Sequence, residues 1–195
     1  MPATTAASTT RTVVTPARIL RNGFSRIHYE FLAYFRQGDA VFFSFLFPVV
    51  MLLIFSVALG NITFGKDAAG HAVKAAAYYL PGMLAAGVLL SGLQNLAVDI
   101  AGEKSDGTLK RLAGTPLSVT SYFIGKIGRA LVTGILQAAL LILVAWLVFG
   151  VKLPTAAGAW LTFAWVFLLG VAACAVLGIG LSGLPRSGKS AAAVI

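Results

Sequence analysis

The residues that most clearly suggest chemistry lie late in the sequence, where residues 183–190 read G-L-P-R-S-G-K-S. This octapeptide satisfies G-x-x-x-x-G-K-[ST], the phosphate-binding loop of nucleotide-binding proteins. Such a loop lies between a strand and a helix, so that its backbone N–H groups and its lysine converge on the phosphates. The mechanism also needs an acidic residue to hold magnesium. No Asp or Glu follows Asp106, and the preceding apolar run is long enough for a membrane helix. We therefore interpret the octapeptide as a chance match and keep nucleotide binding at residues 183–190 as a remote alternative.

Other catalytic or metal-binding patterns are missing from the sequence. The two histidines, His28 and His71, are far apart, and neither an H-E-x-x-H motif nor a Ser/His/Asp constellation occurs. Cys174 is the single cysteine, so no disulfide framework or Cys-based zinc site can form within one chain. We expect no catalysis by this chain, no cofactor and no metal.

The composition indicates a membrane protein. The chain is 58% hydrophobic and only 11% charged, and its apolar residues are concentrated in long runs. The net charge of +9 does not indicate nucleic-acid binding, because no polar domain gathers the basic residues. We expect contact with membrane lipid and none with nucleic acid.

Residues 99–126 are the one long polar segment between apolar runs. They hold three of the six acids and four of the fifteen bases. Gly107 can supply a turn, residues 108–113 are typical of a short helix, and Thr115-Pro116 ends that helix. The sequence therefore predicts a water-exposed loop between two spans, with a short helix of its own.

This segment resembles the type-2 ABC transporter permeases, the membrane subunits of exporters that include daunorubicin-type drug and polysaccharide exporters. The similarity rests on Glu103-Lys104, Gly107-Thr108-Leu109, Arg111-Leu112 and Thr115-Pro116-Leu117, which follow the family pattern E-R-x-x-G-T-L-x-R-L-x-x-T-P-L. The resemblance implies an ATPase subunit as partner, a second permease copy or homologue, and this loop as the coupling element. The coupling residues that it implies are Glu103, Gly107, Thr108, Leu109, Arg111, Leu112, Thr115 and Pro116.

Within this loop we expect Leu109 and Leu112, three residues apart on one helical face, to anchor the coupling helix on the ATPase. Arg111 is a candidate for a contact with an acidic group of that partner.

The apolar runs predict an all-α polytopic membrane bundle with four spans. Each run is long enough to cross a bilayer and carries no charge. The predicted spans are residues 41–59, 75–98, 130–149 and 159–181. Residues 191–195 read as the start of a fifth span, so the chain looks truncated against the six spans that the family resemblance implies.

Residues 17–37 have a different pattern. Leu20, Phe24, Ile27 and Phe31 recur at spacings of three and four, which predicts an amphipathic helix, and its basic residues favour a place in the membrane interface. The permease resemblance implies an elbow helix here. Residues 1–16 lack core-forming side chains and predict a disordered tail.

Three amides, Gln94, Asn95 and Gln137, fall within the predicted spans. Because amides at membrane depth are costly without partners, they are candidates for a substrate path. Hydrogen bonds between helices are an equally good interpretation. Pro48, inside the first span, predicts a kink where a neighbour must satisfy the freed carbonyl.

The distribution of charge predicts the orientation. With a cytoplasmic N-terminus, twelve of the fifteen Lys and Arg residues fall on the inner side. We therefore expect a multi-pass plasma-membrane protein whose segment 99–126 is cytoplasmic. The residues point to the permease of an ATP-driven exporter. An ATP-independent channel or membrane-assembly factor stays open as the alternative.

Overall fold

The computed structural model describes residues 16–66, 70–115 and 118–185. Within these ranges the regular structure is helical; extended pairing is limited to an isolated bridge between Lys66 and Ala72. The helices are α1 (Pro16–Phe35), α2 (Gly38–Ala58), α3 (Ala75–Val88), the π-helical η1 (Leu89–Gln94), α4 (Asn95–Ser105), α5 (Thr108–Ala113), α6 (Val119–Phe149) and α7 (Ala157–Leu181). The predicted all-α class is confirmed. The predicted tail and fifth span lie outside the described residues, apart from Pro16.

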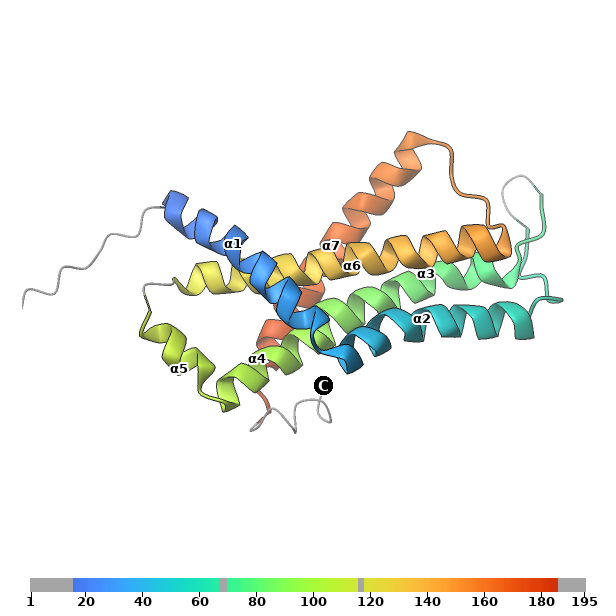
Figure 1. Ribbon diagram of the computed structural model, residues 1–195. Coiled ribbons are helices and arrows are strands. Elements are labelled where there is room, and N and C mark those ends of the chain that lie inside the picture. The colour runs from blue at the N-terminus through green and yellow to red at the C-terminus, as the bar shows by residue number, and fades with distance from the viewer. Residues whose placement is uncertain (1–15, 67–69, 116–117, 186–195) are drawn as a thin grey trace, which may run out of the picture.

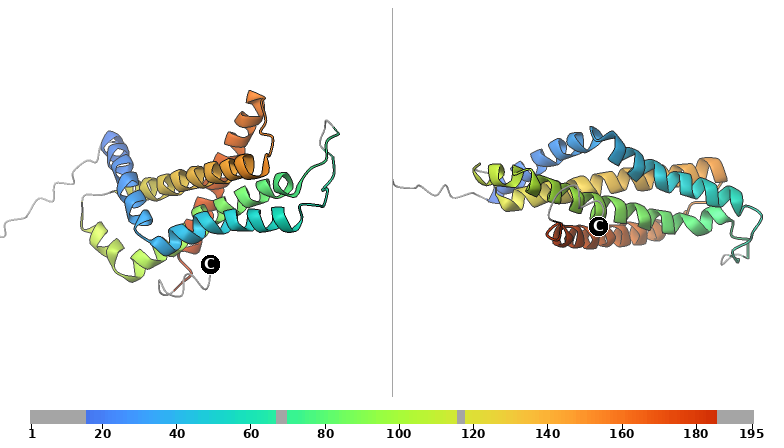
Figure 2. Two further views of the ribbon diagram at one scale, coloured as in Figure 1. Left: turned by 45° about the vertical axis from the view of Figure 1, so that its right-hand side comes forward. Right: turned by 90° about the horizontal axis from the view of Figure 1, so that it is seen from below.

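Four helices of the described chain are long and apolar enough to cross a membrane. They are α2, the continuous helix formed by α3, η1 and α4, then α6, and α7. The predicted four-span bundle is therefore confirmed. The helices α2, α3 and α6 run side by side, while α7 leans away from them toward its N-terminal end (Figures 1 and 2).

Two of these helices are longer than the hydrocarbon core of a bilayer. Both the continuous helix Ala75–Ser105 and α6 have 31 residues, which corresponds to a length of about 46 Å. The hydrocarbon core is about 30 Å thick, so several turns of each helix extend beyond it. The charged residues of both helices lie in α4 and in the first turns of α6, at the end that carries α5 (Figure 1), so we assign the extensions to that end.

The polar segment 99–126 is more helical than the sequence analysis expected. The helix α4 continues to Ser105 and α6 already begins at Val119. The Ser118 side chain caps α6 by accepting a hydrogen bond of 3.1 Å from the Ser121 backbone N–H. The loop therefore shrinks to the part around α5, because the charged residues at its two ends are paired between helices.

The first helix, α1, lies obliquely across the extended end of α6 (Figure 1). Gly125 of α6 permits this approach, because a Cβ there would lie 2.8 Å from the Arg26 Cγ. Part of the predicted apolar stripe turns away from the bundle: Leu20 and Phe24 are 53% and 67% exposed. Ile27, by contrast, packs against Gly128. Seating of the exposed stripe in the membrane interface stays a prediction.

Candidate functional site

The most concentrated group of charges in the described residues surrounds the ammonium of Lys126. This side chain is 1% exposed and lies on α6. Its Nζ donates to the carboxylates of Glu30 at 2.7 Å, Asp99 at 2.5 Å and Glu103 at 2.7 Å. The three acids come from α1 and α4, so one ammonium ties three helices together. We call Lys126, its three acids and the residues Arg26, Arg129 and Tyr122 the ion-pair cluster.

Further partners complete this cluster. Arg129 contacts Asp99 at 3.1 Å, and Arg26 contacts Glu30 at 3.1 Å. The Tyr122 hydroxyl donates to Glu103 at 2.6 Å. Three acids therefore face three bases, and the cluster as a whole carries no net charge. This balance is what a partly buried ionic group needs, because an unpaired buried charge is strongly destabilising.

Aromatic rings enclose two sides of the cluster. The guanidinium carbon of Arg26 lies 4.8 Å from the ring centroid of Tyr122, and that of Arg129 lies 5.3 Å from the centroid of Tyr34. Such cation–π contacts compensate part of the lost hydration of the guanidinium groups. Burial raises the pKa of the Tyr34 phenol above its usual value of 10.0, so this ring stays neutral at physiological pH.

The spacing of charged residues along each helix builds the cluster. Asp99 and Glu103 are four residues apart on α4, as are Arg26 and Glu30 on α1, so each pair lies on one helical face. The extended end of α6 packs against α1, and the long side chain of Lys126 reaches across to the acids of α4 as well. Sequence reasoning placed Asp99 and Lys126 in a solvated loop and gave Glu30 no role. The repeated spacing of four was the signal available.

The acids of the cluster also have the arrangement of a metal site, with ligand oxygens of Glu30, Asp99 and Glu103 within 4.8 Å of one another. The Lys126 ammonium contacts all three of them. The chain's own cation therefore performs the charge compensation that a metal ion would otherwise supply.

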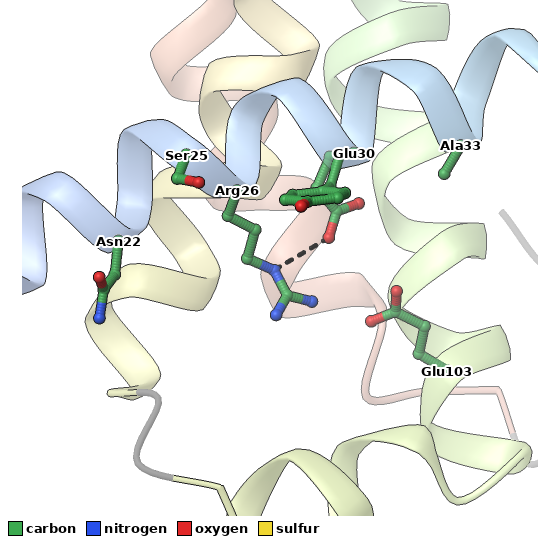
Figure 3. A pocket seen from close by; sticks show the side chains of 7 residues that line it. Asn22, Ser25, Arg26, Glu30, Ala33 and Glu103 are labelled. Atoms are coloured by element: carbon green, nitrogen blue, oxygen red, sulfur yellow. Dashed lines mark hydrogen bonds and ion pairs between the residues drawn. The ribbon is translucent and has the colours of Figure 1, made fainter.

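A cavity of about 470 Å³ opens beside the cluster, between α1 and α4 (Figure 3). The side chains of Arg26, Glu30 and Glu103 project toward this space, and the Arg26–Glu30 ion pair runs along its α1 wall. Its remaining lining residues are Asn22, Ser25, Tyr29 and Ala33. The cluster is therefore reachable from the side of α1 that lies opposite the exposed apolar stripe.

The short helix α5 connects the two extensions. Gly107 precedes it with φ of +74°, a left-handed conformation that favours glycine, and Thr115 Oγ1 donates to the Leu112 carbonyl at 2.7 Å. Lys110 and Arg111 are exposed. Thr108 is half-buried, and Pro116, the last of the expected coupling residues, lies outside the described residues.

The two leucines of α5, predicted to anchor it on an ATPase, make contacts within the chain. Leu109 and Leu112 are half-buried and pack against a core cluster formed by Leu96, Ile100, Tyr122 and Ala175. The sequence spacing identified a real apolar face, but this face attaches α5 to the chain's own bundle. Lys110 and Arg111 make up the charged part of the outward surface.

A second polar group lies within the helices that are long and apolar enough to cross a membrane. Pro48 of α2 has no N–H, so the carbonyl of Ser44, four residues earlier, lacks its usual helical donor. Gln137 supplies the missing donor: its Nε2 lies 2.5 Å from the Ser44 oxygen. Asn95 Nδ2 donates to the Ser44 hydroxyl at 2.6 Å. Two of the three amides predicted to line a substrate path are therefore hydrogen-bonded between helices.

Neighbouring residues adapt to this polar group. Gln137 is 1% exposed and fits against Gly87, where a Cβ would approach its amide within 2.8 Å. Gln94, the third amide, is half-buried and ends the π-helical turn η1 directly before Asn95. Since one such turn shifts the register of all later residues, η1 helps to direct Asn95 toward α2.

The octapeptide at residues 183–190 follows α7, which is a helix and not the strand that a phosphate-binding loop requires. Residues 186–190 lie outside the described part of the chain.

Comparison with known protein families matches residues 61–195 to the family described as ABC-2 family transporter protein. The match covers more than half of the chain and includes α5 and most of the ion-pair cluster. Comparisons with curated proteins and with solved structures found no match.

Proposed function

This chain belongs to the ABC-2 family of transporter proteins, and we propose that it is the permease subunit of an ATP-driven exporter. In this proposal a separate ABC ATPase docks on α5, and a second permease copy or homologue completes the transport path. The N-terminus and α5 lie in the cytoplasm and the chain resides in the plasma membrane. The bias of basic residues toward one side supports this orientation.

The observation that carries the proposal is that the ion-pair cluster joins α4 and α6, the two helices that flank α5 in the chain. Glu103 lies five residues before the first residue of α5, and Lys126 lies on the first turns of the helix that follows α5. A displacement of α5 therefore reaches α4 and α6 through the chain itself. Through Lys126 and its contact with Glu30, the same displacement reaches α1.

Within this proposal the coupling residues have different roles. Leu109 and Leu112 fix α5 to the bundle, so that α5 cannot move without the spans. Lys110 and Arg111 face outward and supply charge for an acidic surface of the ATPase. Glu103 has a third role: its carboxylate accepts hydrogen bonds from Lys126 and Tyr122 and so links α4 to α6.

A transport path would then open between spans as they change their contacts. Gln94, Asn95 and Gln137 are our candidates for its polar lining. Gln137 is buried in this conformation, so it could line a path only after α2 separates from α6. Such a separation requires two conformational states with different helix contacts. ATP-driven movement of α5 would shift the equilibrium between these states.

The test is reconstitution with an ABC ATPase encoded by an adjoining reading frame. The proposal predicts that the two proteins co-purify and that transported substrate stimulates ATP hydrolysis. Substrate flux across vesicles with this chain alone and no ATPase would instead identify an ATP-independent channel. Normal export by cells that lack the chain would exclude a transport role.

A further inference from the structure

A second polar cavity, of about 410 Å³, adjoins the start of α3 and the end of α6. These helix ends lie opposite the end that carries α5 (Figure 1). The cavity lies between the segment that leads into α3 and the turn that follows α6. Its lining residues are His71, Ala72, Val73, Lys74, Ala77, Phe149, Gly150, Val151 and Lys152. The volume lies within the range of roughly 300–1,000 Å³ that is usual for small-molecule sites.

The charges that line this cavity have one sign. Lys74 directly precedes α3 and Lys152 lies two residues beyond Gly150, so two separate segments each bring one ammonium. The described lining residues include no acid, and the described residues contain no ion pair for either lysine. Asp67, the acid of the preceding loop, lies outside the described residues. Two lysines that line one cavity, with no acid among its described lining residues, favour an anionic ligand.

The rest of the lining defines the class of anion. Ala72, Val73, Ala77, Phe149 and Val151 give the cavity an apolar wall beside its lysines. A free inorganic anion gains nothing from such a wall, whereas a phosphate ester has both a charged and an apolar part. The position also fits, because α3 and α6 cross the membrane and this cavity lies at their ends, where phospholipid headgroups are found.

We propose that this cavity binds a phosphate ester, with Lys74 and Lys152 on the phosphate and the apolar wall on the esterified group. The apolar wall favours a phospholipid headgroup of the adjacent leaflet as the source. This site is independent of ATPase coupling, because it lies at the other end of the bundle from α5.

Binding to the purified full chain in neutral detergent tests the proposal. The probes are short-chain phosphatidylglycerol, inorganic phosphate and a short-chain diacylglycerol, which has the apolar part without the phosphate. We expect phosphatidylglycerol to bind and diacylglycerol not to bind. Lys74→Gln and Lys152→Gln should each weaken binding about fivefold, the usual effect of one lysine near an anionic surface. Lys152→Arg should retain most of the affinity.

The matched control is Lys66→Gln, which removes an exposed lysine of the same loop that does not line the cavity. The proposal requires that this variant binds as the unchanged protein does. An equal loss of affinity with Lys66→Gln would overturn the proposal, since the lysines would then act as general surface charge. The absence of binding by both phosphate probes would also overturn it. If inorganic phosphate binds as tightly as phosphatidylglycerol, the apolar wall contributes nothing to the affinity, and the assignment to a phosphate ester is wrong. All three lysines are exposed, so unchanged circular dichroism should show that each variant folds.

Discussion

Removal of the Lys126 ammonium is the sharpest test of the ion-pair cluster. In Lys126→Met, Asp99 would keep Arg129 at 3.1 Å and Glu30 would keep Arg26 at 3.1 Å. Glu103 would keep only the hydroxyl of Tyr122, so its carboxylate would have no basic partner. Breaking a buried ion pair from one side typically costs about 3–5 kcal/mol, and we expect a loss of this size in the free energy of unfolding.

Two double variants with equal net charge separate this explanation from a general charge effect. Lys126→Met with Glu103→Gln removes the one carboxylate that has lost its basic partner, so it should recover most of the stability. Lys126→Met with Asp99→Asn instead leaves both Arg129 and Glu103 without an opposite charge, so it should recover none. Denaturant titration of the detergent-purified proteins measures the difference. Equal recovery in both double variants, or a Lys126→Met protein as stable as the original, would refute the reasoning.

Two further predictions concern the spans. Gln137→Leu should reduce the free energy of unfolding by roughly 1–3 kcal/mol, because the Ser44 carbonyl would lose its donor. The loss should be smaller in a Pro48→Ala background, because the new backbone N–H at position 48 can donate to that carbonyl. Equal losses in the two backgrounds, measured by the same titration, would contradict this account. Cysteines introduced at Lys110 and Lys152, with the native cysteine replaced, should react with an impermeant reagent from opposite sides of the membrane, position 152 from outside. Labelling of position 110 from outside intact cells would contradict the proposed orientation.

The helices of this chain could be predicted from the sequence because each spanning helix contains an uncharged apolar run long enough to cross a bilayer. The short helix α5 was also predictable, since Gly107 and Thr115 mark its two ends. Both features depend on local properties of the chain: length, polarity and turn chemistry.

The ion-pair cluster could not be predicted in the same way. Lys126 contacts Glu30, which is 96 positions away, and only the packing of α1 against the extended end of α6 brings the two together. A charged residue beyond an apolar run has the same sequence pattern whether water or another helix surrounds it. The spacing of Asp99 and Glu103 indicates a shared face but does not identify the partner of that face.

The hydrogen-bond partners of the intramembrane amides could not be predicted from the sequence either. Sequence reasoning found that Pro48 leaves a carbonyl without a donor and that Gln137 needs a partner. It could not identify Gln137 as the donor for that carbonyl, because Ser44 and Gln137 are 93 positions apart in the chain.

The central claim, that α5 couples this chain to an ATPase, is tested most directly by co-purification with a charge-reversed α5. Arg111→Glu changes an exposed side chain, so membrane insertion and denaturant stability should stay unchanged. The account predicts that this variant loses the ATPase, while Lys66→Glu, at the opposite end of the bundle, retains it. A well-expressed protein with both Lys110→Glu and Arg111→Glu that still binds the ATPase and supports export would contradict the claim.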